Sequence, residues 1–489
     1  MKQPKELPEL ILGDGSQSNA SKLSRLQAKG IIRKIYQKVY TSNLEDPLEL
    51  IVKRHAHHIA GHICPRGVLS HRTAFEGGIA KNSILVITEN SERTIKLPGL
   101  TIKVTKGPGA SEEDLSHIGN LKMSSFPRML LENLQITRDK GGVRKTVSKE
   151  TIESKLDQIC SINGEDESNE IRDQAKSIGS KLGMDREFKK LDTLIGSLLG
   201  TRASNSLATP SGIARAKGQA YDTARIDLFD TLCEALIRTN PLPIEDPIGP
   251  SDNAPRLNRA FFESYFSNYI EGTQFILSDA EDIVFKKTSY ETRPQDSHDI
   301  LATFELASAP ESEYPSPLNP EEFLSSLKAT HSTLMHSRTE VSPGKFKLKM
   351  NQAGATQFVS PHLVKGTLIQ AFERAAQLSN PLSKALFLMF VVSEVHPFND
   401  GNGRAARLVM NSYLSNNRLC RIIIPTHRRV DYIQSLKAMS IGKPVPFVGF
   451  MTKMHQETSR LSFQTIESAT AQYRAIDAFE EYPEGFSMH

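Results

Sequence analysis

Residues 396–407 read HPFNDGNGRAAR, and this stretch decides the fold of the C-terminal half of the chain. Before it, residues 386–392 (LFLMFVV) are an unbroken apolar run that predicts a buried helix. After it, residues 405–411 (AARLVMN) favour a second helix. The two glycines between these segments permit left-handed backbone. The stretch therefore predicts a helix–loop–helix corner whose backbone N–H groups converge on an anion.

The side chains of this corner suit a nucleoside triphosphate. His396 can take a proton from an incoming hydroxyl near neutral pH, and Asp400 offers the hard oxygen ligands that Mg²⁺ prefers. The Gly401-Asn402-Gly403 turn allows phosphate oxygens to approach the backbone closely. Arg404 and Arg407 lie three residues apart, so both can clamp terminal phosphates. The residue types predict a catalytic base, a metal ligand and a phosphate cradle within twelve residues.

The stretch resembles the signature of the Fic family, His-x-Phe-x-(Asp/Glu)-Gly-Asn-Gly-Arg-x-x-Arg, and meets every specified position. The resemblance covers roughly residues 255 to 460 and implies a mainly α-helical core with a small β-hairpin flap at residues 345–358. It implies transfer of AMP from ATP to a Tyr, Thr or Ser hydroxyl of a target protein docked on that flap, with pyrophosphate leaving. Gly403 argues against the members that transfer phosphate, which carry Lys at that position.

Two further segments extend the resemblance. Residues 422–425 and Tyr432 resemble the part of the family that closes over adenine. Ser440, in contrast, falls near the position where many members carry an Asn that contacts the nucleotide. The resemblance therefore adds Tyr432 to the expected nucleotide site and leaves the choice of nucleotide beyond ATP open.

Residues 256–272 read as one helix that Gly272 closes. Ser267 and Glu271 are four residues apart and share a helical face. They resemble the inhibitory motif (Ser/Thr)-x-x-x-Glu-(Gly/Asn) of Fic proteins that carry the inhibitor before the core. The resemblance implies that Glu271 pairs with Arg407 and takes the place of the γ-phosphate, so the enzyme would be autoinhibited.

Composition divides the rest of the chain. Residues 240–250 are rich in proline and cannot continue a helix or a sheet, and Gly107, Pro108 and Gly109 mark a softer break. The expected parts are a winged-helix-like α+β domain at 1–105, a helical middle domain at 106–238, a linker at 239–255, the catalytic core at 256–460 and a C-terminal helix and tail at 461–489.

The N-terminal part has its own character. Residues 22–40 predict a helix, a glycine stop and then strand, as in the third helix and wing of a winged helix. Residues 1–105 hold 16 Lys or Arg and 9 Asp or Glu, an excess of seven positive charges. The segment loosely resembles the winged helix of abortive-infection-type antitoxins. It is expected to bind double-stranded DNA, or to serve in protein contacts or packing.

The composition of the whole chain also bears on zinc sites, disulfide bonds and membrane spans. The four cysteines have no CxxC spacing, which argues against a zinc module and a disulfide framework, and no apolar run approaches a membrane span. The expectation is a soluble, cytoplasmic enzyme, with self-association left open. Two rival functions remain at this stage: removal of AMP from a modified protein by the same fold, and a DNA-binding regulator with a Fic sensor core.

Overall fold

The computed structural model describes residues 7–79, 81–136, 144–162, 164–249, 251–288, 292–310, 316–354 and 356–481. The chain divides into two compact units, residues 1–218 and residues 219–489. Helices make up most of the described chain, as the sequence predicted, and the strands of the described residues form a three-stranded sheet, a six-stranded sheet and a two-stranded hairpin. Within the described residues, no helix combines the length and the apolarity that crossing a membrane requires.

The first unit begins with one helix and a small antiparallel sheet. The elements are β1 (Leu10–Leu12), α1 (Gln17–Ala28), β2 (Arg33–Tyr36) and β3 (Val39–Thr41), with strand order β1-β3-β2. The hydroxyl of Ser16 caps α1 by accepting from the Asn19 N–H, and Gly30 turns the chain with φ of +69°. The predicted helix, glycine stop and hairpin are therefore present, while assignment to the winged-helix class stays a prediction.

A six-stranded mixed sheet follows, in the order β6-β7-β5-β4-β9-β8. Its strands are β4 (Val68–Leu69), β5 (Ile84–Glu89), β6 (Arg93–Leu97), β7 (Leu100–Lys106), β8 (Leu115–Ser116) and β9 (Lys122–Met123). Helices α2 (Leu48–Arg54), α3 (Ala56–Ile63) and α4 (His71–Phe75) complete this part. The boundary expected at residue 105 does not coincide with the end of the sheet, because the chain leaves β7 through the Gly-Pro-Gly loop and returns to pair β9 with β4.

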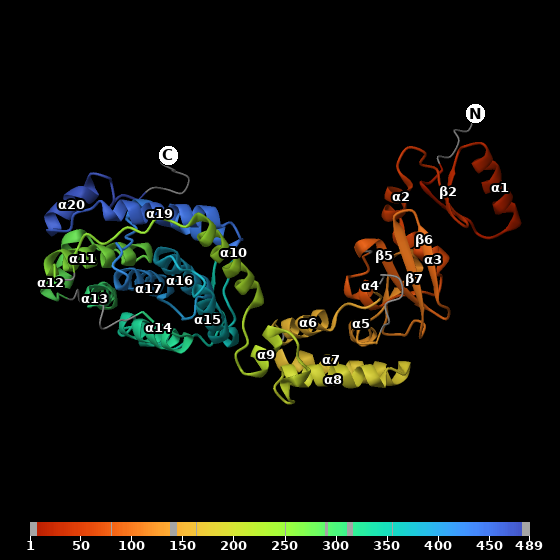
Figure 1. Cartoon of the computed structure of the whole chain (residues 1–489), viewed down its shortest axis with the longest axis horizontal. Coiled ribbons are helices and arrows are strands. Elements are labelled where there is room, and N and C mark those ends of the chain that lie inside the picture. The colour runs from red at the N-terminus through yellow and green to blue at the C-terminus, as the bar shows by residue number, and fades with distance from the viewer. Residues whose placement is uncertain are drawn as a thin grey trace. The chain divides into compact units, whose positions relative to one another are not determined.

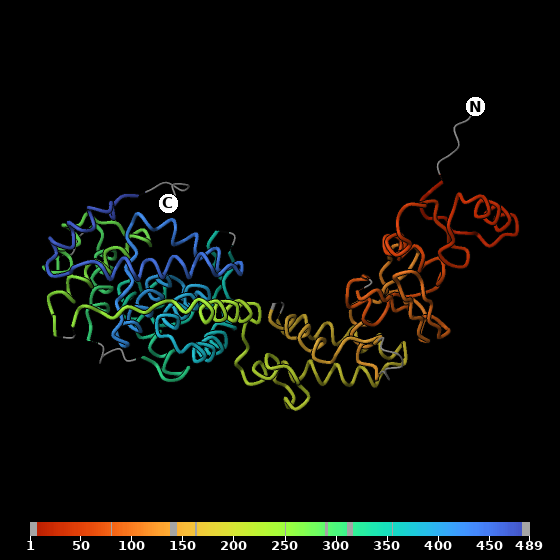
Figure 2. Tube along the Cα trace, turned by 45° about the horizontal axis from the view of Figure 1, so that its top comes forward, coloured from red at the N-terminus to blue at the C-terminus, as the bar shows by residue number. Residues whose placement is uncertain are grey.

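The first unit ends in helices with a core of their own. These are α5 (Phe126–Asn133), α6 (Lys149–Ile162), α7 (Gly164–Leu182), α8 (Asp185–Leu198) and α9 (Pro210–Ala216). Their buried side chains, among them Leu131, Ile178 and Leu194, form a hydrophobic cluster separate from that of the sheet. Helices α7 and α8 lie side by side, as Figures 1 and 2 show. The helical character expected for this region is confirmed.

The second unit is a helical assembly around two central helices. Its elements are α10 (Thr223–Thr239), α11 (Asn253–Ile270), α12 (Leu277–Lys286), α13 (Pro294–Ser308), α14 (Pro320–Leu334), α15 (Pro361–Ala375), α16 (Pro381–Val395), α17 (Asn402–Asn416), α18 (Arg429–Ser440), α19 (Pro444–Ser459) and α20 (Ile466–Arg474). Helices α16 and α17 lie in the middle, with α11, α13, α14, α15 and α19 around them (Figure 1). Helix α16 is buried on nearly every face, which explains its uniformly apolar sequence.

Helix α10 corrects the expected end of the middle domain at residue 238. It belongs to the second unit, where Phe229 packs edge-on against Phe387 and Phe390 of α16. The apolar face of α10 looks like that of any amphipathic helix, so its partner could not be read from the sequence. The domain therefore begins before the proline-rich segment rather than after it.

Two short segments complete the second unit. The proline-rich segment is an ordered strap: Glu245 pairs with Leu419 in an isolated bridge, and the Cys420 N–H donates to the Ile244 carbonyl at 2.9 Å. The expected flap is a hairpin of β10 (Gln352–Ala353) and β11 (Thr356–Gln357). The last part of the expected tail, residues 482–489, lies outside the described residues.

Candidate active site

The predicted helix–loop–helix corner is present. Helix α16 ends at Val395, and His396 closes it in the left-handed region with φ of +51°. Gly401, with φ of +72°, starts α17, whose first residue is Asn402. The opening N–H groups of a helix have no acceptor within the helix, so this turn presents free donors and the positive end of a dipole. The glycine-rich turn is therefore built to receive an anion.

The loop between the helices is held by its own side chains. The buried amide of Asn402 accepts from the Phe398 N–H at 2.9 Å and donates to the Phe398 carbonyl at 3.0 Å. The Phe398 ring is fully buried and stacks on His331, with ring centroids 3.7 Å apart. Asn402, expected among the nucleotide-binding residues, thus uses its side chain to close the loop.

Three residues that the sequence analysis missed also hold this loop. The His331 Nδ1 accepts from the Gly344 N–H at 3.0 Å, so its Nε2 carries the proton and donates to the Asp400 carbonyl at 3.0 Å. The Lys347 ammonium donates to Asn351 at 2.5 Å, and the Asn351 amide donates to the Phe398 carbonyl at 2.9 Å. The contacts of His331 with Asp400 and of Asn351 with Phe398 join residues 69 and 47 positions apart, so no local pattern predicts them.

His396 is arranged as a neutral base. Its Nδ1 lies 3.2 Å from the Ser393 carbonyl, and because a carbonyl only accepts, Nδ1 carries the proton and Nε2 keeps a lone pair. Burial lowers the pKa of His396 to about 4, so the ring is neutral at pH 7. The Phe358 ring stacks on the imidazole with centroids 3.8 Å apart, which fixes its plane.

Arg407 faces the expected inhibitory residues. Its Nη2 lies 2.8 Å from Glu271 Oε1, and its Nε donates to the Ser267 hydroxyl at 3.0 Å. The Glu271 carboxylate lies over the glycine turn, because a side chain at Gly403 would collide with Glu271 Oε1. The structure therefore brings Ser267, Glu271, Gly403 and Arg407 together, as the two motifs predicted.

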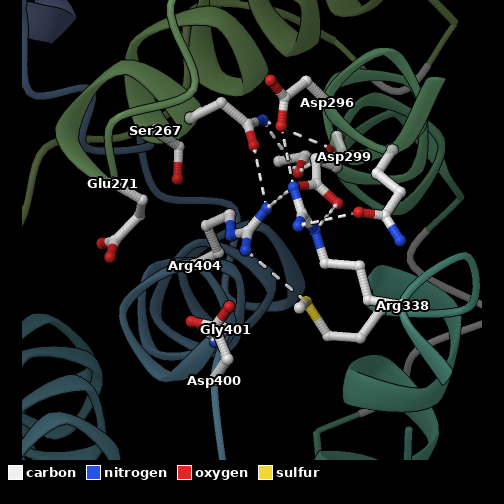
Figure 3. Close-up of polar contacts among 12 residues, drawn as sticks. Ser267, Glu271, Asp296, Asp299, Arg338, Asp400, Gly401 and Arg404 are labelled. Atoms are coloured by element: carbon white, nitrogen blue, oxygen red, sulfur yellow. Dashed lines mark hydrogen bonds and ion pairs between the residues drawn. The ribbon is translucent and has the colours of Figure 1, made fainter. Parts of the chain in front are cut away.

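Arg404 has a different environment from Arg407. Its Nη1 forms an ion pair with the fully buried Asp299 at 2.7 Å and donates to Asn268 at 3.2 Å. Asp299 also receives the Nε of Arg338 at 3.0 Å, and Figure 3 shows the Arg404 guanidinium directed toward this pair, away from Asp400. In this arrangement Arg404 is a buried structural cation, which the sequence interpretation as a phosphate clamp did not anticipate.

Asp400 is exposed at the mouth of the corner, and its Oδ1 accepts from the Gly401 N–H at 2.7 Å. The described residues hold no cluster of three or more His, Cys, Asp or Glu that would cage a metal. Mg²⁺ commonly takes one or two carboxylates and fills its remaining positions with substrate phosphates and water. A single exposed carboxylate beside an anion site fits that mode of binding.

The site opens into a pocket of about 420 Å³. Both polar and apolar side chains line this pocket. Its lining includes Glu271, Phe358, Phe390, Glu394, His396, Gly403, Arg407, Tyr432, Leu436 and Ser440. The buried Tyr432 ring lies beside Arg407, with its centroid 5.8 Å from the guanidinium carbon. The base, the glycine turn, Arg407 and Tyr432 therefore border one cavity large enough for a small organic anion.

Residues 321–414, which lie within this helical unit, match the model of the Fic/DOC family. Among curated proteins, the chain is similar to protein adenylyltransferase fic-1 of Caenorhabditis briggsae, with 29% identity over 133 residues, or 26% of each protein. It is also similar to protein adenylyltransferase Fic of Drosophila melanogaster, with 26% identity over 258 residues, covering 49% of this chain and 48% of that protein. These alignments span between a quarter and a half of the relatives' length.

Among solved structures, Fic-1 of C. elegans (residues 134–508) aligns with a TM-score of 0.37 and 17% identity. The alignment covers 68% of this chain and 90% of that one.

Proposed function

We propose that this protein transfers AMP from ATP to a hydroxyl group of a protein, and that Glu271 restrains the reaction. The observation that carries the proposal is one pocket bordered by a neutral His396 with an open Nε2, by the Gly403 turn and by Arg407. This set combines a proton acceptor with an anion cradle, which is what nucleotidyl transfer to a hydroxyl needs. The names of the relatives, protein adenylyltransferases, agree with it.

The chemistry follows from these groups. The target oxygen attacks the α-phosphorus as its proton passes to His396 Nε2, the bond to the pyrophosphate breaks, and pyrophosphate leaves. The Gly401–Gly403 backbone and Arg407 hold the triphosphate and neutralise its charge. Asp400 would hold Mg²⁺, which supplies further charge neutralisation when bound. Positioning therefore accounts for most of the expected rate.

The flap supplies the docking edge for the target. The β10–β11 hairpin has only two short strands, and Phe358, just after β11, stacks on His396. An extended peptide segment can pair with the open edge of such a hairpin through its backbone. A hydroxyl residue in that segment would then reach Nε2 of His396, which is the proposed entry of the substrate.

Autoinhibition rests on the Glu271–Arg407 pair. The carboxylate neutralises the arginine and occupies the space over Gly403. ATP that binds beside it would have its terminal phosphate displaced, and in-line transfer depends strongly on such geometry. The Ser267 hydroxyl, which accepts from Arg407, holds the arginine in the restrained position.

The deciding experiment is mass spectrometry of the purified protein after incubation with ATP and Mg²⁺. We expect the Glu271→Gly variant to gain mass equal to AMP on its own hydroxyl residues, and the Glu271→Gly/His396→Ala variant to gain none. Addition of phosphate alone, or no addition to the protein or to any protein in a cell extract, would overturn the proposed function.

Removal of AMP from a modified protein is a second reaction that one observation favours. Glu271 borders the same pocket as His396 and is only partly buried, so its carboxylate can orient a water molecule. Incubation of an AMP-modified protein with the wild type and with Glu271→Gly separates the reactions. Release of AMP that requires Glu271 supports removal, whereas transfer that increases without Glu271 supports adenylylation.

DNA binding by residues 1–105 is a separate proposal. Lys22, Arg25 and Lys29 of the α1 region and Lys34 and Lys38 of the hairpin are all exposed. Basic side chains on a helix and an adjacent hairpin suit contacts to phosphates. A gel shift of the full chain with duplex DNA at increasing salt tests it, and complete lack of binding at low salt would leave a protein-contact role.

A cytoplasmic location is also proposed. The cysteines Cys64, Cys160, Cys233 and Cys420 are all buried and free. Free buried thiols are typical of proteins in a reducing compartment. Fractionation of cells that produce the protein would test this location directly.

A further inference from the structure

The segment that enters the flap is fixed to the catalytic loop. The Lys347 N–H donates to the Pro397 carbonyl at 2.9 Å, and its buried ammonium donates to the Val395 carbonyl at 3.4 Å. The Phe346 ring packs against Phe398, with ring centroids 5.5 Å apart. These contacts hold residues 346 and 347 against the loop, so the side chains of their neighbours have a defined position on the surface.

The neighbouring side chains are exposed. Lys345 and Lys349 are exposed cations, and Leu348 and Met350 are 90% and 51% exposed. Neither ammonium has an ion-pair or hydrogen-bond partner within the described part of the chain. Because two residues of chain span at most about 7 Å, both lysines lie close to the fixed Lys347. We call these four exposed residues the flap rim; it combines two cations with two apolar side chains.

The flap rim adjoins the site of the proposed chemistry. Ala353 and Thr356 of the hairpin and Phe358, just after it, line the same pocket as His396. The Phe358 ring stacks on His396, and the Lys347 ammonium lies 5.9 Å from the centre of that ring. A peptide that pairs with the hairpin and brings a hydroxyl group to His396 would therefore pass next to the flap rim.

The sequence around the flap lacks acidic residues. Residues 341–372 contain four lysines and no aspartate or glutamate. The whole chain has 56 acidic residues among 489, so a stretch of this length would be expected to hold three or four. Charge of one sign at a docking surface attracts partners of the opposite sign and repels those of the same sign. The flap therefore favours an acidic partner.

We propose that the flap rim docks an acidic segment of the target protein, in which carboxylate residues and an apolar residue flank the modified hydroxyl residue; this rests on the proposed function. The carboxylates pair with Lys345 and Lys349, and the apolar side chain packs on Leu348 and Met350. Backbone pairing with the hairpin is independent of sequence, whereas these side chains supply specificity. Because the rim acts on docking, it should affect the KM for the target and leave kcat unchanged.

Peptides of equal length with a single tyrosine test the proposal. The tyrosine is flanked by Glu and Leu, by Gln and Leu, or by Lys and Leu, and transfer is measured with the Glu271→Gly protein. We expect kcat/KM to be about 3- to 30-fold higher for the Glu peptide than for the Gln peptide and lowest for the Lys peptide. The difference should lie in KM and shrink as salt rises. Equal kcat/KM for the three peptides would overturn the proposal.

Charge reversal at the rim should invert the preference. Glu271→Gly/Lys345→Glu/Lys349→Glu should favour the Lys peptide, with the KM for ATP unchanged. The matched control is Glu271→Gly/Arg238→Glu/Arg418→Glu, which alters exposed cations at the distal ends of α10 and α17, about 20 Å along each helix from the end nearest the site. An unchanged preference in the rim variant, or the same inversion in the control, would overturn the proposal. So would a matching rise in the KM for ATP, since the lysines would then serve the nucleotide.

Direct binding separates this inference from the proposed function. Fluorescently labelled peptides with Phe in place of Tyr cannot be modified, so their affinity reports docking alone. Tighter binding of the Glu version than of the Gln version, without transfer to any hydroxyl, would leave the flap rim standing and remove adenylylation. Transfer without a charge preference would do the reverse. Single-stranded DNA that binds more tightly than the Glu peptide and displaces it would make the rim a nucleic-acid surface and overturn the proposal.

Discussion

The two ends of the pocket that His396 borders are built in different ways. At one end, His396, Gly403 and Arg407 come from one stretch of twelve residues. At the opposite end, Glu394, Ser440 and Arg225 come from α16, α18 and α10, more than 200 residues apart at the extremes. One end of the pocket is therefore formed within a short motif, whereas the other end depends on the packing of separate helices.

Arg404 and Arg407 also have different surroundings, although only three positions in the sequence separate them. Arg407 faces the pocket and the half-exposed Glu271, while Arg404 is buried against Asp299. Three residues on a helix leave the two side chains only about 60° apart, so the different surroundings of Arg404 and Arg407 come from the packing of other helices and not from the spacing. A shared motif therefore does not imply a shared role, and the following variants test how far the roles differ.

The largest effect is expected for His396→Ala. Loss of a general base lowers the rate by about 10²–10⁴-fold, whereas ATP affinity should change little because the turn and Arg407 remain. Radiolabelled transfer and calorimetric ATP binding on the Glu271→Gly background measure the two quantities. Labelling by the Ala variant at the parent rate would contradict the assignment of the base.

The next largest effect is expected for the buried ion pair of Asp299 and Arg404. Asp299→Asn should lower the free energy of unfolding by about 3–5 kcal/mol, because it leaves the buried Arg404 without its counter-charge. The matched control is Asp296→Asn, whose partly exposed carboxylate pairs with the same Arg338 and should cost about 0–1 kcal/mol. Urea unfolding of both variants checks the difference, and equal stability would mean that Arg404 is not a structural cation.

Asp400→Asn tests the exposed carboxylate. The neutral amide is a weaker Mg²⁺ ligand, so transfer should fall by about a hundredfold at low Mg²⁺ and recover in part with more Mg²⁺ or with Mn²⁺. Rates across a metal titration provide the measurement. Normal activity at sub-millimolar Mg²⁺ would exclude Asp400 as the metal ligand.

The smallest change in rate, and the only gain, is expected for Glu271→Gly. Freeing Arg407 should raise self-modification by about tenfold, within the range of coupling energies between competing ligands. Radiolabel incorporation is compared with the wild type, and Glu271→Gly/His396→Ala serves as the inactive control. A variant no faster than wild type would leave Glu271 as an ordinary residue at the end of α11.

The sequence predicted the helix–loop–helix corner and its meeting with α11 well because their determinants are local. The apolar run before His396 and the glycines after it define the corner, and the four-residue spacing of Ser267 and Glu271 placed both on the face that meets Arg407. The hairpin flap was expected from the family resemblance and is present. Each of these features needs only the periodicity of a helix or the conformational freedom of glycine.

The remainder depends on contacts that no local pattern records. His331 binds the Asp400 carbonyl from 69 residues away, and Arg225 reaches Glu394 across 169 positions. The domain boundaries expected at 105 and 238 shifted for the same reason, since β9 returns to β4 and α10 packs on α16. Composition marks where regular structure stops, but it does not reveal which segments come together afterwards.

Arg225 of α10 forms an ion pair with Glu394 of α16, and this contact limits where the chain can be truncated. The segment that matches the family, residues 321–414, contains His396 and the glycine turn but none of Arg225, Glu271, Tyr432 or Ser440. A fragment cut to that segment would keep the glycine turn and lose Glu271, the α18 wall of the pocket and the strap that pairs with Leu419. The segment that matches the family model is thus smaller than the compact unit that contains it, which begins at residue 219.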